Sequence, residues 1–168
     1  MGTWGITERQ SDYGLDLLGT IVATKLKQSD FAVFNVTEAL EAVTADIMEE
    51  IRQANRGCSA EKMVYYFSEN FPQNFTHGAL LVAECLADYY RTGELTVTEY
   101  VGENYDPVDH HIKEVVVTPA NFKVLLDELQ SVQNPEHEIY QGWFRDNDRE
   151  KWLAHIRSVC QTLRQHGA

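Results

Sequence analysis

The chain has 168 residues, of which 43% are hydrophobic and 24% are charged, so it can build a core of its own and its bulk is not of the disordered class. Its 26 Asp and Glu residues against 14 Lys and Arg residues give a formal net charge of −12. Because Lys and Arg supply most of the affinity for phosphates, this balance argues against nucleic acid and against anionic membrane surfaces as partners.

The targeting and redox signals favour a cytoplasmic protein. The N-terminus has no basic region followed by an apolar run, and no stretch approaches the length of about 18 apolar residues typical of a membrane span. Cys58, Cys85 and Cys160 form no C-x-x-C pair and are odd in number, so we expect reduced thiols. We therefore expect a single globular domain over residues 1–168.

Two amphipathic helices are predicted near the N-terminus. Ser11 and Asp12 can cap a helix over residues 12–28, in which leucine and valine recur at helical spacing. Residues 35–38 fit a capping box, and they predict a second helix that ends near Gly57.

A proline separates the next two predicted helices. Ser59 can cap a short helix over residues 61–68, and Pro72 is expected to break the chain before a further helix over residues 74–90. The later helix has the most small and apolar residues of the chain. We therefore expect it at the centre of the bundle.

The C-terminal half begins with alternating, β-branched segments. Residues 95–101 and 111–117 predict the two strands of an antiparallel hairpin, which must pack on the helices to be stable. Pro119 marks the start of a further helix, a short segment ends near Phe144, and the last helix starts near Asn147. The predicted fold is mainly α, a bundle-like domain of five to six helices with one small antiparallel hairpin.

The charged face of the helix over residues 74–90 is the best candidate for a metal site. His77, Glu84 and Asp88 recur at i, i+7 and i+11, opposite the apolar stripe, and could hold a divalent cation. However, His77 and Glu84 are two turns, about 10 Å, apart along the helix. The favoured alternative is a solvated face with an Asp88–Arg91 ion pair.

Other catalytic patterns are lacking in the sequence. It has no G-x-S-x-G elbow, no phosphate-binding loop and no G-x-G-x-x-G motif. The neighbours His110 and His111 point to opposite faces of a strand, and Glu136, His137 and Glu138 do not converge on a helix. We therefore expect no cofactor, and a binding role is favoured over an enzyme.

Aromatic residues are concentrated around Tyr65, Tyr66 and Phe67. Three consecutive aromatic residues cannot all face one way on a helix, so at least one should lie near the surface. Tyr65 and Tyr66 are the candidates for contact with a partner, since aromatic side chains are enriched in interfaces. The alternative is that this cluster forms the core between two helices.

The N-terminal segment supplies further binding candidates. Trp4 lies between Gly2 and Gly5, and it is predicted to anchor the segment onto the body. Asp12 and Asp16 lie one turn apart at the start of the first helix, where the helix dipole favours acidic residues. Both are candidates for binding, and ordinary first-turn acids are the alternative.

These same residues carry a family resemblance. The opening Met-Gly-Thr-Trp-Gly, followed by Ser11-Asp12 and Leu15-Asp16, resembles a bacterial family of uncharacterised proteins, the domain of unknown function 4259. The resemblance covers roughly the first twenty residues. It implies a bacterial, cytosolic protein and brings no established activity.

Three functional hypotheses remain. The favoured one is an interaction protein whose acidic helix faces bind a basic protein partner; one form is an immunity protein that neutralises a basic toxin, with acidic residues mimicking phosphate. The second is a structural domain that forms a homo-oligomer through the aromatic segment. The third is an enzyme or metal-binding protein that uses His77, Glu84 and Asp88.

Overall fold

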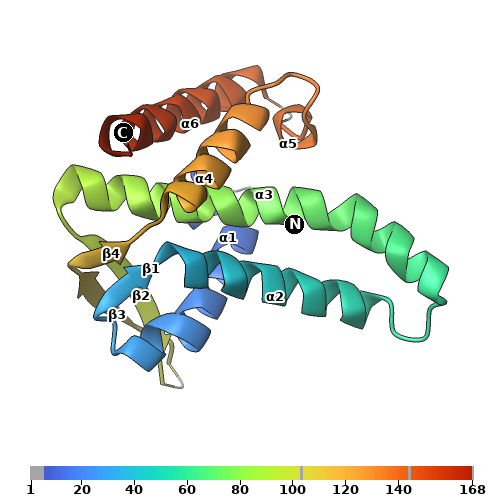
Figure 1. The fold of residues 1–168 in the computed structure, drawn as a ribbon, viewed down its shortest axis with the longest axis horizontal. Coiled ribbons are helices and arrows are strands. Elements are labelled where there is room, and N and C mark those ends of the chain that lie inside the picture. Colours follow the sequence, from blue (N-terminus) through green and yellow to red (C-terminus); the bar gives the residue numbers. More distant parts are fainter. Residues whose placement is uncertain (1–5, 103, 144, 168) are drawn as a thin grey trace.

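The computed structural model describes residues 6–102, 104–143 and 145–167. Within these ranges the chain forms six α-helices and two small sheets, which confirms the mainly α fold. Figure 1 shows α3 running through the middle, with α4 and α6 on one side and α1 and α2 on the other. The helices are α1 (Asp12–Ile21), α2 (Val36–Ala54), α3 (Ala60–Thr92), α4 (Pro119–Ser131), α5 (Glu138–Gln141) and α6 (Asp146–His166).

The N-terminal part turns back on α1. A short 3-10 turn, η1 (Glu8–Gln10), precedes α1, and the Ser11 side chain caps α1 by accepting a hydrogen bond from the Gly14 amide. A Cβ atom at Gly14 would lie 1.9 Å from the carbonyl oxygen of Glu8, so only glycine lets η1 fold this closely onto α1. The helical path predicted over residues 12–28 continues past α1 through η2 (Val22–Leu26) and η3 (Lys27–Ser29).

Helix α2 packs against α3 at very short range. The Asn35 side chain caps α2, as predicted, and Val43 and Ile47 are fully buried. A Cβ atom at Gly78 of α3 would lie 2.2 Å from Cγ1 of Val43, so this glycine allows the close crossing of the two helices. The second predicted helix is therefore confirmed, and its contact with α3 fixes the position of its C-terminal turns.

The predicted break at Pro72 is wrong, because α3 is one helix of 33 residues with this proline inside it. Proline removes one backbone hydrogen bond and costs about 3 kcal/mol in a helix interior. Side chains around it bind neighbouring carbonyl groups: Asn70 donates to Tyr66, and Thr76 donates to Pro72. The packing of the following turns against the body keeps the helix continuous, and Figure 1 shows its N-terminal third bending toward α2.

The predicted hairpin is present, with a shifted second strand. β2 (Leu95–Val101) pairs antiparallel with β3 (Asp106–Ile112), so the second strand lies five residues earlier than 111–117. The connection is tight, since Gly102 and Tyr105 adopt positive φ angles of 72° and 53°. Pairing can therefore begin at once after the turn, although the first residues of β3 are polar.

The later part of the predicted strand belongs to a different pair. β4 (Glu114–Val116) runs parallel to β1 (Val33–Asn35), which the periodicity of the sequence did not predict. This pair joins the start of α2 to the start of α4, and Thr37 and Asn121 of these helices are hydrogen-bonded at 2.9 Å. The two sheets therefore close one end of the bundle.

The core forms around α3, as predicted for its later turns. Almost every side chain from Thr76 to Ala87 is buried, and Leu95, Val97 and Ile112 bury the inner side of the hairpin. No helix in the described ranges is long and apolar enough to cross a membrane.

Candidate functional site

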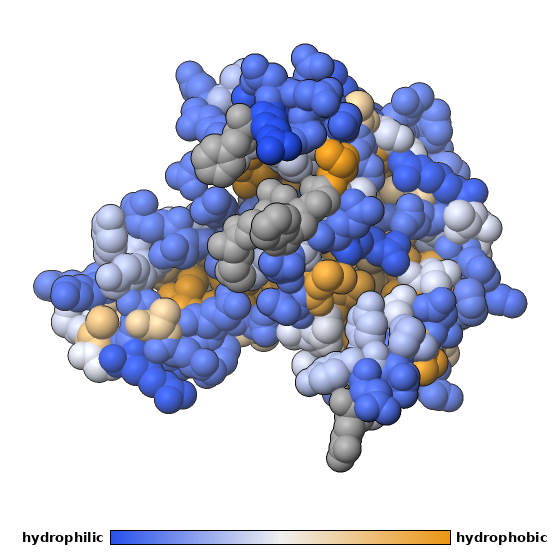
Figure 2. Space-filling model, turned by 180° about the vertical axis from the view of Figure 1, so that it is seen from behind, coloured by the Kyte–Doolittle hydropathy of each residue, from blue (hydrophilic) through white to orange (hydrophobic). Residues whose placement is uncertain are grey.

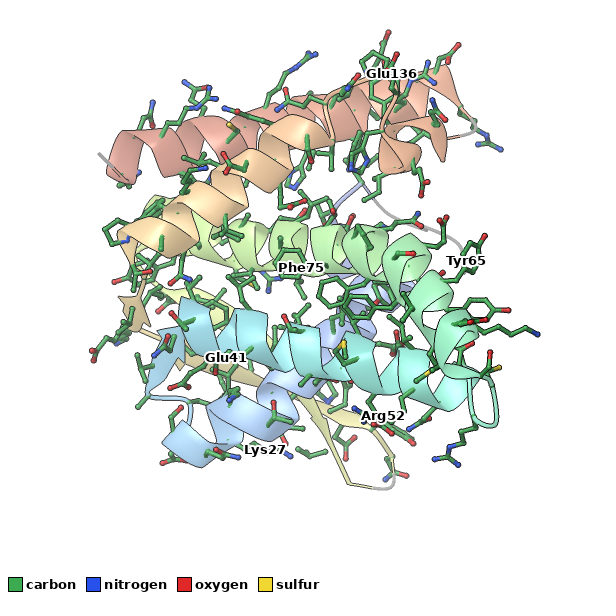
Figure 3. All side chains as sticks on the ribbon, turned by 45° about the vertical axis from the view of Figure 1, so that its right-hand side comes forward. Lys27, Glu41, Arg52, Tyr65, Phe75 and Glu136 are labelled. Atoms are coloured by element: carbon green, nitrogen blue, oxygen red, sulfur yellow. The ribbon has the colours of Figure 1, made fainter. Side chains whose placement is uncertain are left out.

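The first turns of α3 and the last turns of α2 extend beyond the body as a helical hairpin, which we call the aromatic arm (residues 48–71; Figure 1). Four consecutive large side chains of the arm are exposed: Val64 by 69%, Tyr65 by 61%, Tyr66 by 40% and Phe67 by 37%. Figure 3 shows Tyr65 on the outer side of α3. The prediction that at least one of these aromatic residues lies at the surface is thus confirmed, and both Tyr65 and Tyr66 are exposed.

The aromatic cluster is only partly a core. Phe67, Phe71 and Phe75 form a stacked ladder along α3, with ring centroids 4.8 Å and 5.9 Å apart. Phe71 and Phe75 pack against the hydrophobic core, whereas Phe67 reaches the surface. The ladder therefore connects the arm to the body through Phe67.

Two hollows lie along the seam between α2 and α3 in the arm. The first, of about 280 Å³, is apolar apart from one arginine and is lined by Met48, Ile51, Arg52, Met63, Val64 and Phe67. The second, of about 390 Å³, is more polar and is lined by Glu50, Ile51, Ala54, Asn55, Cys58, Tyr66, Asn70 and Asn74. Figure 2 shows orange and pale-orange residues within this arm, at the left of the view, surrounded by hydrophilic surface. Flexible methionine side chains and aromatic rings are typical of adaptable protein-binding grooves.

An acidic face on α1 and α2 adjoins the second hollow. Asp12 and Asp16 are exposed on α1, and Asp46 and Glu50 lie on the neighbouring turns of α2. The Tyr13 hydroxyl donates to Glu50 at 3.4 Å; burial, followed by the negative charges of Glu50 and Asp46, raises the pKa of Tyr13 far above its usual value. Burial and Asp46 also raise the pKa of Glu50. This face therefore places four carboxyl groups beside the polar hollow that Tyr66 lines.

The predicted face of His77, Glu84 and Asp88 lies elsewhere, against η1 and α6. Glu84 is only 4% exposed, and its carboxylate accepts hydrogen bonds from the backbone amides of Glu8 at 3.0 Å and Arg9 at 3.2 Å. Nε2 of His155 on α6 lies 2.7 Å from the same carboxylate. The expected solvated face is therefore wrong for Glu84, because η1 and α6 cover it.

The neighbouring polar groups continue this contact, which we call the polar seam (Glu8, Arg9, His77, Glu84, Asp88 and His155). Nδ1 of His77 lies 3.1 Å from the buried Glu8 carboxylate, and Arg9 binds Asp88 at 2.7 Å. The predicted Asp88–Arg91 pair is also present, at 3.5 Å. The seam thus fastens η1 to α3 and α6 with charge-assisted hydrogen bonds, which are stronger than neutral ones.

The seam has few free ligand atoms. In the described part of the chain, every buried side-chain nitrogen or oxygen has a hydrogen-bond partner. Among the same residues, no three His, Cys, Asp or Glu side chains are arranged to hold a metal ion. His77 and Glu84 are each held by a different partner, so the structure does not bring them together.

The sequence contains one sign of the polar seam, which the prediction from helical periodicity did not use. Glu84 stands inside the most apolar run of α3, between Ala83 and Cys85, where a carboxylate must be buried and needs partners. Glu8, Arg9 and His155 were missed because they are distant in sequence. The adjacent Cys85 is fully buried, and this burial raises the pKa of its thiol to about 12, so it packs as a small hydrophobic side chain. Trp4 lies outside the described residues.

Comparisons with known proteins give no relative. No protein-family model matches the chain, and no curated protein or solved structure matches it either. The resemblance of the N-terminal residues to the uncharacterised bacterial family therefore stays a prediction.

Proposed function

We propose that this chain is a protein-interaction domain that binds a basic protein partner through the aromatic arm and the acidic face beside it. The observation that carries the proposal is the exposure of Val64, Tyr65, Tyr66 and Phe67 in one continuous stretch of helix. Large exposed apolar patches rimmed by polar residues mark interaction sites. Tyrosine and methionine, both present here, are enriched in the centres of interfaces.

The charge pattern supports a basic partner. The net charge is −12, and Asp12, Asp16, Asp46 and Glu50 concentrate negative charge next to the hollow that Tyr66 lines. Opposite charges across an interface raise the association rate and select the partner. A basic amphipathic helix would place apolar side chains in the seam of the arm and basic ones over the acidic face. An immunity protein that neutralises a basic toxin is one form that this proposal takes.

The experiment compares capture of partners by the tagged wild-type protein and by two sets of variants. Tyr65→Ala and Tyr66→Ala test the arm, and Tyr100→Ala is the matched control, since Tyr100 is as exposed as Tyr65, at 61%. We expect capture of a basic protein that each arm variant weakens by about 2 kcal/mol, as at an interface hot spot, and that the control retains.

The acidic face is tested in the same capture. Asp12→Asn with Asp16→Asn should slow association and reduce its dependence on salt, because long-range attraction is screened by ions. Asp146→Asn on α6, a distant exposed acid, should have no such effect. Equal capture by the wild-type protein and all the variants would contradict the proposal.

Self-association through the same arm is the second candidate, favoured by the apolar hollow between Met48, Met63 and Val64. Sedimentation analysis over a range of concentrations distinguishes the two. A dimer that Val64→Asp dissociates, with no basic partner captured, would favour self-association.

A further inference from the structure

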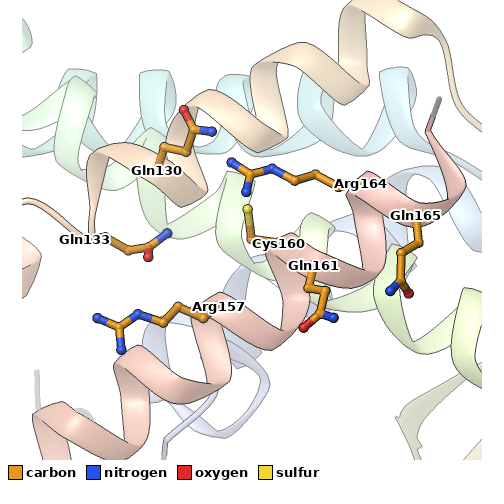
Figure 4. Close-up of a pocket in the computed structure, with 7 residues that line it drawn as sticks. All are labelled: Gln130, Gln133, Arg157, Cys160, Gln161, Arg164 and Gln165. Atoms are coloured by element: carbon orange, nitrogen blue, oxygen red, sulfur yellow. The ribbon is translucent and has the colours of Figure 1, made fainter.

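A third hollow, of about 570 Å³, lies on the opposite side of the molecule from the arm, between α4 and α6. Its lining residues are Gln130, Gln133, Arg157, Cys160, Gln161, Arg164 and Gln165. Figure 4 shows Arg157 and Arg164 on one side of α6 with Cys160 between them, and Gln130 and Gln133 facing them from α4. Small-molecule sites have volumes of this order.

The charge of this region differs from that of the rest of the chain. Although the sequence has 26 Asp and Glu residues, none falls within residues 151–168. Arg9, Arg91 and Arg149 each bind a carboxylate. By contrast, Arg157 and Arg164 form no ion pair with a carboxylate among the residues that the structure describes. Among the described residues, two arginines therefore face one hollow without an acidic partner.

The acidic residues of α4 and α6 that are nearest in sequence to the lining residues do not neutralise the charges of Arg157 and Arg164. On α4, Asp127 is held by Lys123, and Glu128 accepts a hydrogen bond from Thr76 of α3; neither acid lines the hollow. On α6, Glu150 precedes Arg157 by two turns, about 10 Å along the helix axis. The lining of the hollow thus carries two positive charges and no negative one, within an acidic protein.

The side chains that line the hollow favour a ligand with anionic groups. A guanidinium group forms paired hydrogen bonds with a carboxylate or a phosphate. Arg157 and Arg164 are two turns apart, which is about 10 Å along the helix axis. Each can therefore hold one end of a ligand whose two anionic groups are separated by up to about this distance. The amide of Gln133 donates to the Leu129 carbonyl, which leaves its oxygen to accept from a ligand hydroxyl.

We propose that the hollow between α4 and α6 is a binding site for a small dianionic molecule, with Arg157 and Arg164 each holding one anionic group. The glutamines contact the polar middle of the ligand, and Cys160, which is 3% exposed, forms the apolar floor. The ligand is a metabolite-sized phosphate ester or carboxylic acid. The site is independent of the aromatic arm.

The test is titration of the full chain at low ionic strength with inorganic pyrophosphate and with citrate, followed by calorimetry and by NMR signals of the arginine Nε–H and glutamine amide groups. We expect saturable binding of at least one probe, with shifts at Arg157, Arg164 and Gln130. The tighter probe identifies phosphate or carboxylate as the recognised group.

Matched variants make the test decisive. Arg157→Gln and Arg164→Gln should each weaken binding about tenfold or more, since each removes a charge-assisted contact. Arg157→Lys should weaken it less, because the charge stays and only the paired geometry is lost. Arg56→Gln on the arm and Tyr66→Ala should leave the affinity unchanged. Lack of saturable binding of both probes up to about 10 mM, or equal weakening by Arg56→Gln, would overturn the proposal.

Discussion

The two ends of α3 lie in opposite surroundings although both are rich in apolar side chains. Val64 to Phe67, in its first turns, are exposed, whereas Ala79 to Ala87 are almost fully buried against the other helices and the hairpin. One continuous helix therefore serves as core at one end and as surface at the other. Since the first end buries little, its apolar side chains add little to folding and are available to a partner.

The polar groups divide in the same way. Around the buried end of α3, Glu84 is held by two backbone amides and by His155. Around the exposed end, Glu49 and Arg52 form a pair that is largely open to water. Pairs of the first kind hold the fold together, and exposed pairs contribute little.

The largest expected effect is on the free energy of unfolding, and it tests the contrast between the buried and the exposed apolar side chains of α3. Leu81→Ala, at a side chain with 0% exposure, should lower the free energy of unfolding by about 3 kcal/mol, through lost burial and a residual cavity. Val64→Ala, at 69% exposure on the same helix, should change it by less than about 0.5 kcal/mol. Urea denaturation measures both. A comparable loss in the two variants would show that Val64 is buried in solution, as in a dimer.

The next effect tests the polar seam. Glu84→Gln replaces a buried carboxylate by an amide whose NH₂ group cannot accept from the donors around it, and should cost about 2 kcal/mol. The amides of Glu8 and Arg9 should then exchange faster with solvent, because they lose their acceptor. The exposed Glu69→Gln on the arm is the matched control, with a cost near zero. Unchanged exchange at Glu8 would mean that Glu84 does not fasten η1.

The sequence predicted most helices because their caps and apolar periodicity are local signals. Asn35 caps α2, and Thr118 with Asn121 forms the capping box that begins α4. The error at Pro72 has the opposite origin. Local propensity favours a break there, but the buried packing of the later turns, from Thr76 to Ala87, overrides it.

The candidate site was predictable only where its signal is local. Exposure at Tyr65 or Tyr66 follows from three consecutive aromatic residues on a helix. The partners of Glu84 were out of reach, because His155 is 71 residues away and η1 is about as far in the other direction. The parallel pairing of β1 with β4 was missed for the same reason, since strands of three residues have almost no periodicity.

The smallest expected effect compares two adjacent glutamates on the arm. A hydrogen bond from Gln53, together with Arg52, lowers the pKa of Glu49 below its ordinary value of 4.5. Burial and Asp46 raise the pKa of Glu50 above that value. The Glu49 carboxylate therefore adds stability above pH 4.5, which is lost as the pH falls through its lowered pKa. Because its pKa is raised, the folded state binds the Glu50 proton more tightly than the unfolded chain does, and this contribution to stability is lost as the pH rises through the raised pKa.

Glu50→Gln should accordingly raise Tm at pH 7 by about 1 °C, whereas Glu49→Gln should lower it slightly. Both differences should vanish in acid, where the wild-type carboxyl groups are protonated. Added salt should shrink the gain from Glu50→Gln, because it screens the repulsion from Asp46 and Asp16. Thermal denaturation from pH 3 to pH 8 measures the two profiles, and changes of the same sign at pH 7 would contradict the assignment of Glu50 to the acidic face. The opposite signs follow from the different neighbours of the two carboxyl groups, since Glu49 lies beside Gln53 and Arg52 whereas Glu50 lies near Asp46 and Asp16. A basic partner on the acidic face would relieve the repulsion at Glu50, so its binding should lower the pKa of that carboxyl and strengthen as the pH rises.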